Sequence, residues 1–290
     1  MGQEVQLRHL TTLRLGGTPV RYFRPLTEHE LRDALEQCAR GDLAWRVLGG
    51  GSNLLVDDGD LPYAVIHMRT PGFCHVARTG ELSVRAGAGA GTARLLAYCK
   101  EQGLGGLEFL AGIPGTVGGA LADNAGAWGH WISERLLRLT AMTPEGRRRE
   151  YAPPELAFSY RRTDLDGAVV TEAEFLLAPR DPELIGRRMA RHFRDRVERH
   201  PVHEPSAGCI FKNAPGHSAG RLLDLCGLKG LRVGGAEVSK LHANFILNRG
   251  GATAADVLRL IDTMKETVRR QFGVELEMEV RRWPGPAMAA

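Results

Sequence analysis

Hydrophobic residues recur at helical spacing in several stretches of the chain. The first begins at a capping pair, Thr27 and Glu30, and its apolar face runs to Cys38 before Gly41 ends the predicted helix. The same spacing predicts further helices over residues 92–102, from Asp181 onward, over 218–226 and from Thr253 onward. The helix that starts at Asp181 has proline at its first position and an acidic residue in its first turn.

Shorter apolar or alternating runs predict strands between these helices. The runs cover residues 45–48, 82–86, 137–142, 168–177 and 275–281. Because helices and strands alternate irregularly, the pattern favours an α+β fold over a doubly wound sheet. We place a domain boundary where the Asp181 helix begins, giving domains of 1–180 and 181–290.

Composition indicates an ordinary globular protein. Of 290 residues, 43% are hydrophobic and 25% charged, and the net charge of +4 gives no basis for a nucleic-acid partner. The five cysteines form no Cys-x-x-Cys pair, which favours a reducing compartment over a disulfide framework. No apolar run approaches the ~18 residues of a membrane span. We therefore expect a cytoplasmic protein without a membrane partner.

Glycine is over-represented, and two stretches concentrate it. The chain holds 36 glycines, with dense runs within 49–56 and 112–126. Consecutive glycine amides can point into one concavity that holds an anionic oxygen. The common nucleotide signatures are absent, since Leu54 occupies the third glycine position of Gly-x-Gly-x-x-Gly. Either stretch alone could be a tight turn, whereas the two together favour a diphosphate bridge such as that of a dinucleotide.

Two further patterns leave alternatives open. The Asp181 helix is rich in arginine, which is either a solvated face or a site for a phosphate-bearing ligand; these residues are Arg187, Arg188, Arg191, Arg194, Arg196 and Arg199. A metal site at His200, His203 and Cys209 is disfavoured because Pro201 breaks the helical spacing of the two imidazoles. No metal is predicted.

The glycine stretches resemble the flavin-binding loops of the UDP-N-acetylenolpyruvoylglucosamine reductase family, which acts in bacterial peptidoglycan precursor synthesis. Other segments match the family in order and spacing, at residues 12–17, 160–161, 208–213, 227–230, 242–245 and 276–281. The resemblance thus extends over nearly the whole chain. The segment between Arg199 and Gly208 lacks the family's tyrosine-bearing insertion, which is typical of its shorter subtype.

The resemblance implies an FAD-binding fold of the vanillyl-alcohol-oxidase (PCMH) type. Its two subdomains would divide residues 1–180 near residue 68, and a C-terminal α+β domain, 181–290, would bind substrate. FAD would be noncovalent, because 49–56 contains no histidine. The implied FAD-binding residues are Gly49, Gly50, Gly51, Ser52, Asn53, Leu54, Gly112, Ile113, Gly115, Thr116, Gly118, Gly119, Asn124 and Gly126.

The resemblance also implies the reaction and its residues. NADPH would reduce the flavin, and the enolpyruvyl ether of UDP-N-acetylglucosamine would then become UDP-N-acetylmuramate, with no obligate protein partner. Arg161 would stabilise the enolate, Glu279 would act beside it with a raised pKa, and Cys209 would replace the family's usual serine as proton donor. Substrate would also contact Asn213, Lys229 and His242.

Two other functions remain open at this point. One is a different oxidase or dehydrogenase on the same flavin fold, acting on an alcohol or a sugar lactone. The other is a nucleotide-sugar-binding protein that has lost the chemistry. Flavin content and its covalent or noncovalent attachment distinguish these possibilities from the reductase.

Overall fold

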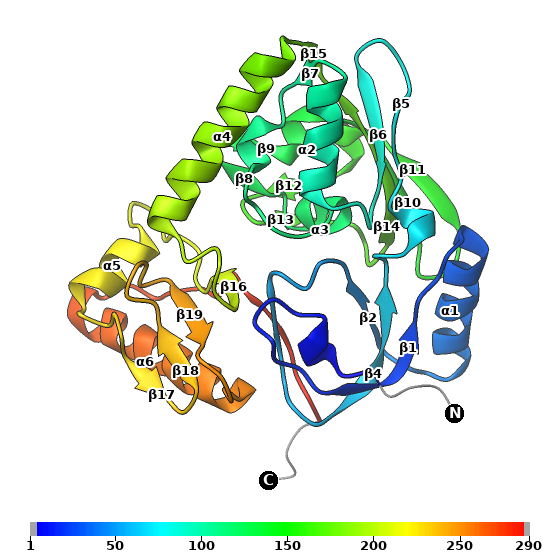
Figure 1. Cartoon of the computed structure of the whole chain (residues 1–290). Helices are drawn as coiled ribbons and strands as arrows, with labels where there is room; N and C mark the ends of the chain where they lie inside the picture. Colours follow the sequence, from blue (N-terminus) through cyan, green and yellow to red (C-terminus); the bar gives the residue numbers. More distant parts are fainter. Residues whose placement is uncertain (1–4, 287–290) are drawn as a thin grey trace. The chain divides into compact units, whose positions relative to one another are not determined.

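Figure 1 shows the computed structural model, which describes residues 5–286. The chain divides into two compact units, each assembled from separate segments. The first unit comprises Met1–Val20, Gly51–Pro62 and Arg196–Ala290, and the second comprises Arg21–Gly50 and Tyr63–Asp195. This division differs from the expected one at residue 180, because the first unit includes N-terminal segments as well as the C-terminal part.

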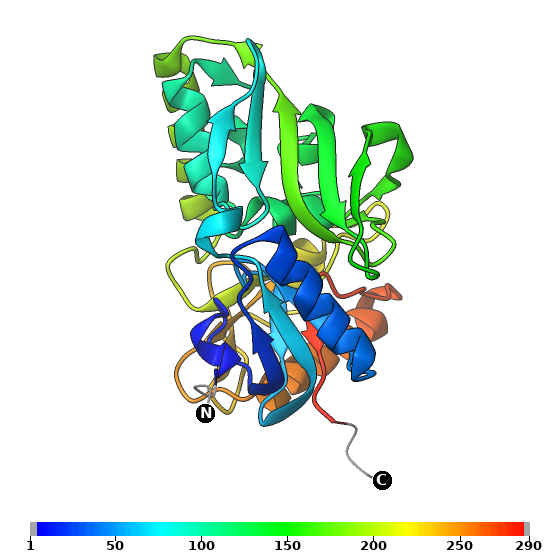
Figure 2. The ribbon, with the colours of Figure 1, turned by 90° about the vertical axis from the view of Figure 1, so that its right-hand side faces the viewer.

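The second unit is built on a five-stranded sheet of order β11-β10-β14-β6-β5, whose neighbouring strands are antiparallel (Figure 2). Apolar side chains of the sheet and of helices α2 and α3 form one core that includes Val84, Leu95, Leu121 and Phe175. The elements are α1 (Glu28–Arg40), β2 (Trp45–Leu48), β5 (Val76–Arg78), β6 (Ser83–Gly87), α2 (Thr92–Glu101), β7 (Leu104–Gly105), α3 (Val117–Ala122), β8 (Gly126–Ala127), β9 (His130–Trp131), β10 (Leu136–Met142), β11 (Arg148–Tyr151), β12 (Phe158–Ser159), β13 (Arg162–Thr163), β14 (Val169–Leu176) and β15 (Ala178–Pro179).

The first unit contains a four-stranded antiparallel sheet of order β16-β19-β18-β17 and two helices. The apolar face of α6, which includes Leu260 and Met264, packs into a core with Leu223, Ile246 and Phe211. The elements are β3 (Leu54–Val56), β16 (Ser206–Cys209), α5 (Ala219–Leu225), β17 (Arg232–Val233), β18 (Ala236–Val238), β19 (Phe245–Asn248), α6 (Ala254–Phe272) and β20 (Arg281–Trp283). β20 runs parallel to β3.

The chain passes from one unit to the other at four points, three of them within elements and the fourth between Gly50 and Gly51. β1 (Thr18–Phe23) and β4 (Asp60–His67) form a three-stranded sheet with β2 in the order β1-β4-β2. α4 (Pro182–Arg199) begins in the second unit and ends in the first. Single 3-10 turns occur at Leu7–His9, Pro71–Phe73, Glu108–Leu110, Ile132–Arg135 and Pro153–Glu155.

The predicted helices are all present, and the α+β class is confirmed. The predicted strand 275–281 is wrong, because residues 275–280 form only an isolated bridge, between Met278 and Phe211, and regular pairing begins at Arg281. Helix α3 was not predicted, since its sequence lies within the second glycine stretch. Among residues 5–286, no helix combines the length and the apolar character needed to cross a bilayer.

Candidate active site

The two glycine stretches approach each other within the second unit. A Cβ atom added to Gly50 would lie 2.6 Å from the Cα atom of Gly115, and one added to Gly49 would lie 2.5 Å from Oγ1 of Thr116. Side chains are therefore excluded at both positions, and main chain faces main chain. The Thr116 hydroxyl also accepts a hydrogen bond from the amide of Gly119 and so caps α3.

The second glycine stretch is held in place by the connection between β6 and α2. Thr92 donates from its hydroxyl to the carbonyl of Ile113 at 2.7 Å, and the amide of Gly118 donates to the carbonyl of Ala88 at 2.8 Å. Gly112 and Gly115 have φ angles of +77° and +116°, which L-residues rarely adopt. Glycine is therefore favoured at these two positions by the backbone conformation of the loop. At Gly115, the close approach of Gly50 is a second reason.

The donor set of this region fits FAD. The loops offer main-chain groups with no room for side chains, which suits a pyrophosphate. Asn124 is 5% exposed, and its Oδ1 atom has no hydrogen-bond partner among the described residues. A buried polar atom without a hydrogen-bond partner is unfavourable, and a bound ligand can provide that partner. The assignment of the individual FAD-binding residues stays a prediction.

The rest of the first glycine stretch belongs to the first unit. Gly51 has a φ angle of +64°, and its carbonyl accepts from the amide of Thr12 at 3.0 Å. The side-chain amide of Asn53 donates to the carbonyl of Glu279 at 3.5 Å, and the amide of Arg281 donates to the carbonyl of Asn53 at 3.1 Å. The segment predicted to bind FAD is therefore fixed beside the predicted catalytic glutamate.

Arg161 lies at the tip of the β12–β13 hairpin in the second unit. Its φ angle is +61°, a left-handed conformation that costs a non-glycine residue about 1–2 kcal/mol. Nη1 donates to the carbonyl of Gly126 at 3.2 Å, and the guanidinium carbon lies 5.3 Å from the ring centre of Tyr160 and 6.0 Å from that of Trp131. These contacts orient the guanidinium.

The second glycine stretch also supports this hairpin. The Nδ2 atom of Asn124 donates to the carbonyl of Ser159 at 3.2 Å, and the hydroxyl of Thr163 donates to the carbonyl of Leu121 at 2.5 Å. One loop therefore contributes residues to the predicted cofactor site and positions the predicted catalytic arginine. Trp131, whose ring meets that of Tyr160 edge-on at 5.8 Å, is a member of this group that the sequence did not indicate.

Cys209 lies at the end of β16 in the first unit, next to an irregularity of the sheet. The register between β16 and β19 shifts between Ser206 and Cys209, and Gly208 has a φ angle of +81°. Such a bulge turns the following side chain away from the regular alternation. Cys209 is partly exposed.

The structure brings Cys209 and Glu279 to adjacent strands of backbone. The amide of Glu279 donates to the carbonyl of Ile210, the residue after Cys209, at 2.8 Å. Two residues along, the amide of Lys212 donates to the carbonyl of Glu277 at 2.9 Å, and their side chains form an ion pair at 2.5 Å. Lys212 therefore has a structural partner, while Arg161 belongs to the other unit.

The three predicted substrate residues all lie in the first unit, with different partners. Asn213 accepts through Oδ1 from the amide of Ala219 at 3.0 Å, at the start of α5, and Lys229 pairs with Asp224 at 2.9 Å. His242 accepts through Nδ1 from the amide of Asn244 at 3.2 Å, which leaves the proton on Nε2. Burial, and then the charge of Lys229, lowers the pKa of His242.

Two residues near this group were not predicted as site residues. Asn244 is 3% exposed, and its side chain makes two hydrogen bonds to the main chain of Phe211, at 2.9 and 2.8 Å. It thereby fixes the segment that carries Cys209. His200 lies 5.0 Å from the ring of His242 and 5.2 Å from that of Phe245, and burial lowers its pKa to about 4. Asn244 belongs to a matched motif, which was the available signal.

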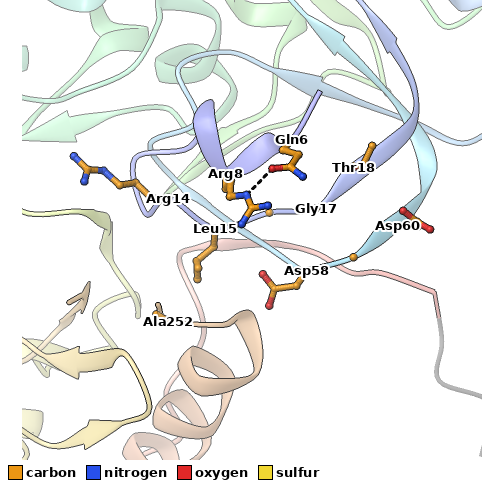
Figure 3. A pocket seen from close by; sticks show the side chains of 11 residues that line it. Gln6, Arg8, Arg14, Leu15, Gly17, Thr18, Asp58, Asp60 and Ala252 are labelled. Carbon is orange, nitrogen blue, oxygen red and sulfur yellow. Dashed lines mark hydrogen bonds between the residues drawn. The ribbon is translucent and has the colours of Figure 1, made fainter. Parts of the chain in front are cut away.

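Other potential sites in the described part of the chain are separate from these residues. A cavity of about 370 Å³ in the first unit has Arg8, Arg14, Asp58 and Asp60 in its wall (Figure 3). None of the predicted site residues lines it, and Asp58 is engaged in capping α6 through the amide of Ala254. Residues 5–286 contain no group of histidine, cysteine and carboxylate side chains arranged to hold a metal ion.

The fold and the glycine loops define a flavoprotein: residues 19–151 match the family described as "FAD binding domain". Residues 200–283 match the "UDP-N-acetylenolpyruvoylglucosamine reductase, C-terminal domain" family. The chain is 42% identical over 282 residues to the UDP-N-acetylenolpyruvoylglucosamine reductase of Pelobacter propionicus, covering 97% of this chain and 94% of that one.

Further relatives agree with this match. The enzyme of the same name from Moorella thermoacetica is 43% identical over 278 residues, covering 95% of this chain and 90% of that one. The crystal structure of the Thermus caldophilus enzyme is 40% identical, with a TM-score of 0.82 over 97% of this chain and 98% of that one. The chain belongs to the UDP-N-acetylenolpyruvoylglucosamine reductase family, and it is an FAD-dependent oxidoreductase.

Proposed function

We propose that this protein reduces the enolpyruvyl ether of UDP-N-acetylglucosamine to UDP-N-acetylmuramate, with NADPH as the electron donor. The observation that carries the proposal is the position of Arg161. Its guanidinium is oriented by the second glycine stretch, 112–126, which is also predicted to bind FAD. Bound FAD, once NADPH has reduced it, would supply the hydride that adds to C3 of the enolpyruvyl group and would return to its oxidised form. The protein's own residues then stabilise the negative charge that this addition creates and neutralise it with a proton.

Hydride addition at C3 places negative charge on C2 and on the adjoining carboxylate. Arg161 suits this task because a guanidinium stays charged at any working pH and can hold a carboxylate with two parallel hydrogen bonds. Its strained backbone and its contacts with Gly126 and Tyr160 reduce the reorganisation needed when substrate binds. This role does not require the arginine to change protonation.

Cys209 delivers a proton to C2 in our proposal. A thiol with an ordinary pKa near 8.5 is more acidic than the hydroxyl of serine, so the transfer is feasible. Glu279, fixed next to Cys209 through the carbonyl of Ile210, shares a proton with the developing enolate rather than opposing it as a bare carboxylate. Asn213, Lys229 and His242 contact the UDP-sugar.

We also propose that the enzyme works in the cytoplasm without an obligate protein partner. The scattered cysteines form no disulfide within residues 5–286, which is compatible with a reducing compartment.

Absorbance of the purified protein tests the main proposal. We expect a yellow protein whose flavin bands bleach anaerobically with NADPH and return when the enolpyruvyl substrate is added. Acid precipitation should leave the colour in the supernatant, since the FAD is noncovalent. A colourless protein that FAD cannot reconstitute, or a yellow acid pellet, would contradict the proposal.

A further inference from the structure

His242, one of the predicted substrate contacts, is held from several directions within the first unit. Its backbone is fixed by Ser239, whose hydroxyl oxygen accepts from the amides of Leu241 and His242 at 3.2 and 3.4 Å. Its Nδ1 atom accepts from the amide of Asn244, which leaves the proton of the neutral ring on Nε2. A Cβ atom added to Gly220 of α5 would lie 2.7 Å from Cε1 of His242, so the helix closes one side of the ring.

Two other rings pack against that of His242. His200 follows the last residue of α4, and its ring centre is 5.0 Å from that of His242. Phe245, at the start of β19, stacks on His200 with centroids 5.2 Å apart and planes 26° apart. The ring of Phe245 also meets that of His242 edge-on at 5.1 Å. The three side chains therefore form one aromatic cluster, in which each ring contacts the other two.

This aromatic cluster is adjacent to the predicted proton donor. In the pairing of β16 with β19, Phe245 is the register partner of Cys209. Residues that lie directly opposite each other in an antiparallel pair have Cβ atoms about 4.5–5.5 Å apart. The cluster therefore connects a predicted contact of the UDP-sugar, His242, with the strand that carries Cys209.

Both imidazoles of the aromatic cluster are neutral near pH 7. The charged groups that act on them are Arg196, Arg199, Lys229 and Asp224. Burial is the largest influence on each ring, so the pKa of His200 is lowered to about 4 and that of His242 lies below its ordinary value of 6.5. Because the neighbouring rings help to bury His242, removal of one of them should expose the imidazole to water and raise its pKa.

We propose that His200 is a positioning residue of the UDP-sugar site, whose ring holds the imidazole of His242 in the orientation that donates to the substrate. The inference rests on the proposed function, in which His242 contacts the UDP-sugar. Asn244 sets the tautomer of this imidazole, while the rings of His200 and Phe245 restrict its rotation. A donor that is fixed in advance loses little entropy on binding, so the loss of His200 should weaken affinity for the UDP-sugar.

Binding of UDP-N-acetylmuramate to the oxidised holoenzyme, followed by calorimetry, measures this effect without turnover. We expect at least tenfold weaker binding by His200→Ala and near-parental affinity in His200→Phe, which retains a ring. The phenylalanine loses no hydrogen bond, since Nδ1 of His200 is buried without a partner in the described structure. The matched control is His203→Ala, an exposed histidine between α4 and β16, which should bind as the parent does. Parental affinity in His200→Ala, or equal losses in His200→Ala and His200→Phe, would overturn the assignment.

Gly220→Ala perturbs the same imidazole from α5. Alanine favours a helix, so the backbone of α5 should tolerate the change, but the new methyl group would lie 2.7 Å from Cε1 of His242. We expect affinity for UDP-N-acetylmuramate to fall at least tenfold while the midpoint of thermal unfolding is retained. Parental affinity in this variant would show that the position of His242 is not critical, and the inference would be wrong.

A double-mutant cycle shows whether His200 acts through His242. If it does, the loss of affinity in the variant with both His200→Ala and His242→Ala should equal that in His242→Ala alone. Additive losses would instead mean that His200 acts independently of His242, which contradicts the inference.

NMR titration of His242 reports on its ring without any ligand. The pKa of His242 should rise toward 6.5 in His200→Ala and stay lowered in His200→Phe. An unchanged pKa in His200→Ala would mean that His200 does not hold the ring. If His242→Ala binds UDP-N-acetylmuramate as the parent does, the proposed substrate contact of His242 fails, whereas the titration still decides the role of His200. The two failures are therefore distinguishable.

Discussion

The guanidinium of Arg161 donates a hydrogen bond to the carbonyl oxygen of Gly126, 3.2 Å away. This contact joins the hairpin that carries the arginine to the second glycine stretch. Two residues earlier in that stretch, Asn124 makes a second contact by donating to the carbonyl of Ser159. The residue proposed to bind substrate is therefore positioned by a loop that is predicted to bind the cofactor, so changes in either should affect the other.

Arg161→Lys should show whether the positive charge alone is sufficient or whether the planar guanidinium is required. Lysine keeps the positive charge but lacks the planar fork, so we expect reoxidation of reduced enzyme by the enolpyruvyl substrate to slow about 100-fold. Bleaching by NADPH should be unchanged, as stopped-flow absorbance can show. The control is Arg162→Lys, since Arg162 is an exposed neighbour paired with Asp164 at 3.9 Å. Similar losses in both variants would argue against the assigned role.

Cys209→Ala should also leave bleaching by NADPH intact, while reoxidation by substrate becomes very slow because the proton donor is gone. Cys209→Ser should restore reoxidation, and it should protect the enzyme from inactivation by peroxide, since serine cannot form a sulfenic acid. Cys226→Ala, a change at another partly exposed cysteine of the first unit, serves as the control. Normal turnover of Cys209→Ala would remove Cys209 from the mechanism.

Helix boundaries and fold class could be predicted from the sequence because capping pairs and apolar periodicity are local signals. Thr27 caps α1 by accepting from the amide of Glu30, as the sequence indicated, and Thr253 caps α6 in the same way. Helix α3 escaped prediction because glycines at 118 and 119 hide its helical pattern. Its start depends on the cap provided by Thr116, and Gly118 is required there because Ala88 leaves no room for a Cβ atom.

The candidate site residues could be predicted mainly from ordered sequence motifs. The residues that contact them in the structure could not be predicted in this way. Nothing local in the sequence places Asn244 against Phe211, because 33 residues separate them and the contact depends on how β19 meets β16. The segment 275–280 was misread for a related reason. Its alternating pattern is real, but only Met278 finds a bridging partner, at Phe211.

Asn244→Ala should destabilise the first unit more than a typical polar substitution. The change removes two hydrogen bonds and leaves the amide and carbonyl of Phe211 buried without partners, which costs about 1–3 kcal/mol for each group. Chemical denaturation should report a loss of about 2–6 kcal/mol in the free energy of unfolding. The control is Thr267→Ala, which removes an exposed hydroxyl on α6 and should change stability by less than about 0.5 kcal/mol. Equal effects would mean that the paired contact contributes little.

Gly50→Ala should impair FAD binding. The added methyl group would lie 2.6 Å from the Cα atom of Gly115, so the two glycine loops would have to separate. We expect protein purified with a reduced ratio of flavin absorbance to protein absorbance, and at least a tenfold weaker affinity on reconstitution. Gly41→Ala is the control, because Gly41 has a negative φ angle and its nearest neighbour would be 3.4 Å from the new atom. Full flavin occupancy in Gly50→Ala would contradict the prediction that the two glycine stretches bind FAD together.

His67 should make stability depend on pH in the acidic range. The residue is 8% exposed, and burial, followed by the charges of Arg24 and Arg69, lowers its pKa from 6.5 to about 4. Its Nδ1 atom meets the hydroxyl of Tyr22 at 2.6 Å, and a main-chain contact with Gly49 opposes the lowering of the pKa without reversing it. The folded protein therefore resists protonation at this site.

As pH falls from 6.5 to 4, the unfolded chain binds a proton at His67 that the folded protein does not. Stability should thus decrease over that window, by about 3 kcal/mol in total from this residue, and then level off. Denaturation curves between pH 7 and pH 4 should show a shallower decrease in His67→Gln, whose amide oxygen can still accept from Tyr22. Some slope should remain, because burial also lowers the pKa of His200 to about 4. The control is His29→Gln, on the exposed face of α1, which should leave the dependence of stability on pH as in the parent. If His67→Gln also leaves that dependence unchanged, His67 is protonated in the folded protein over this range.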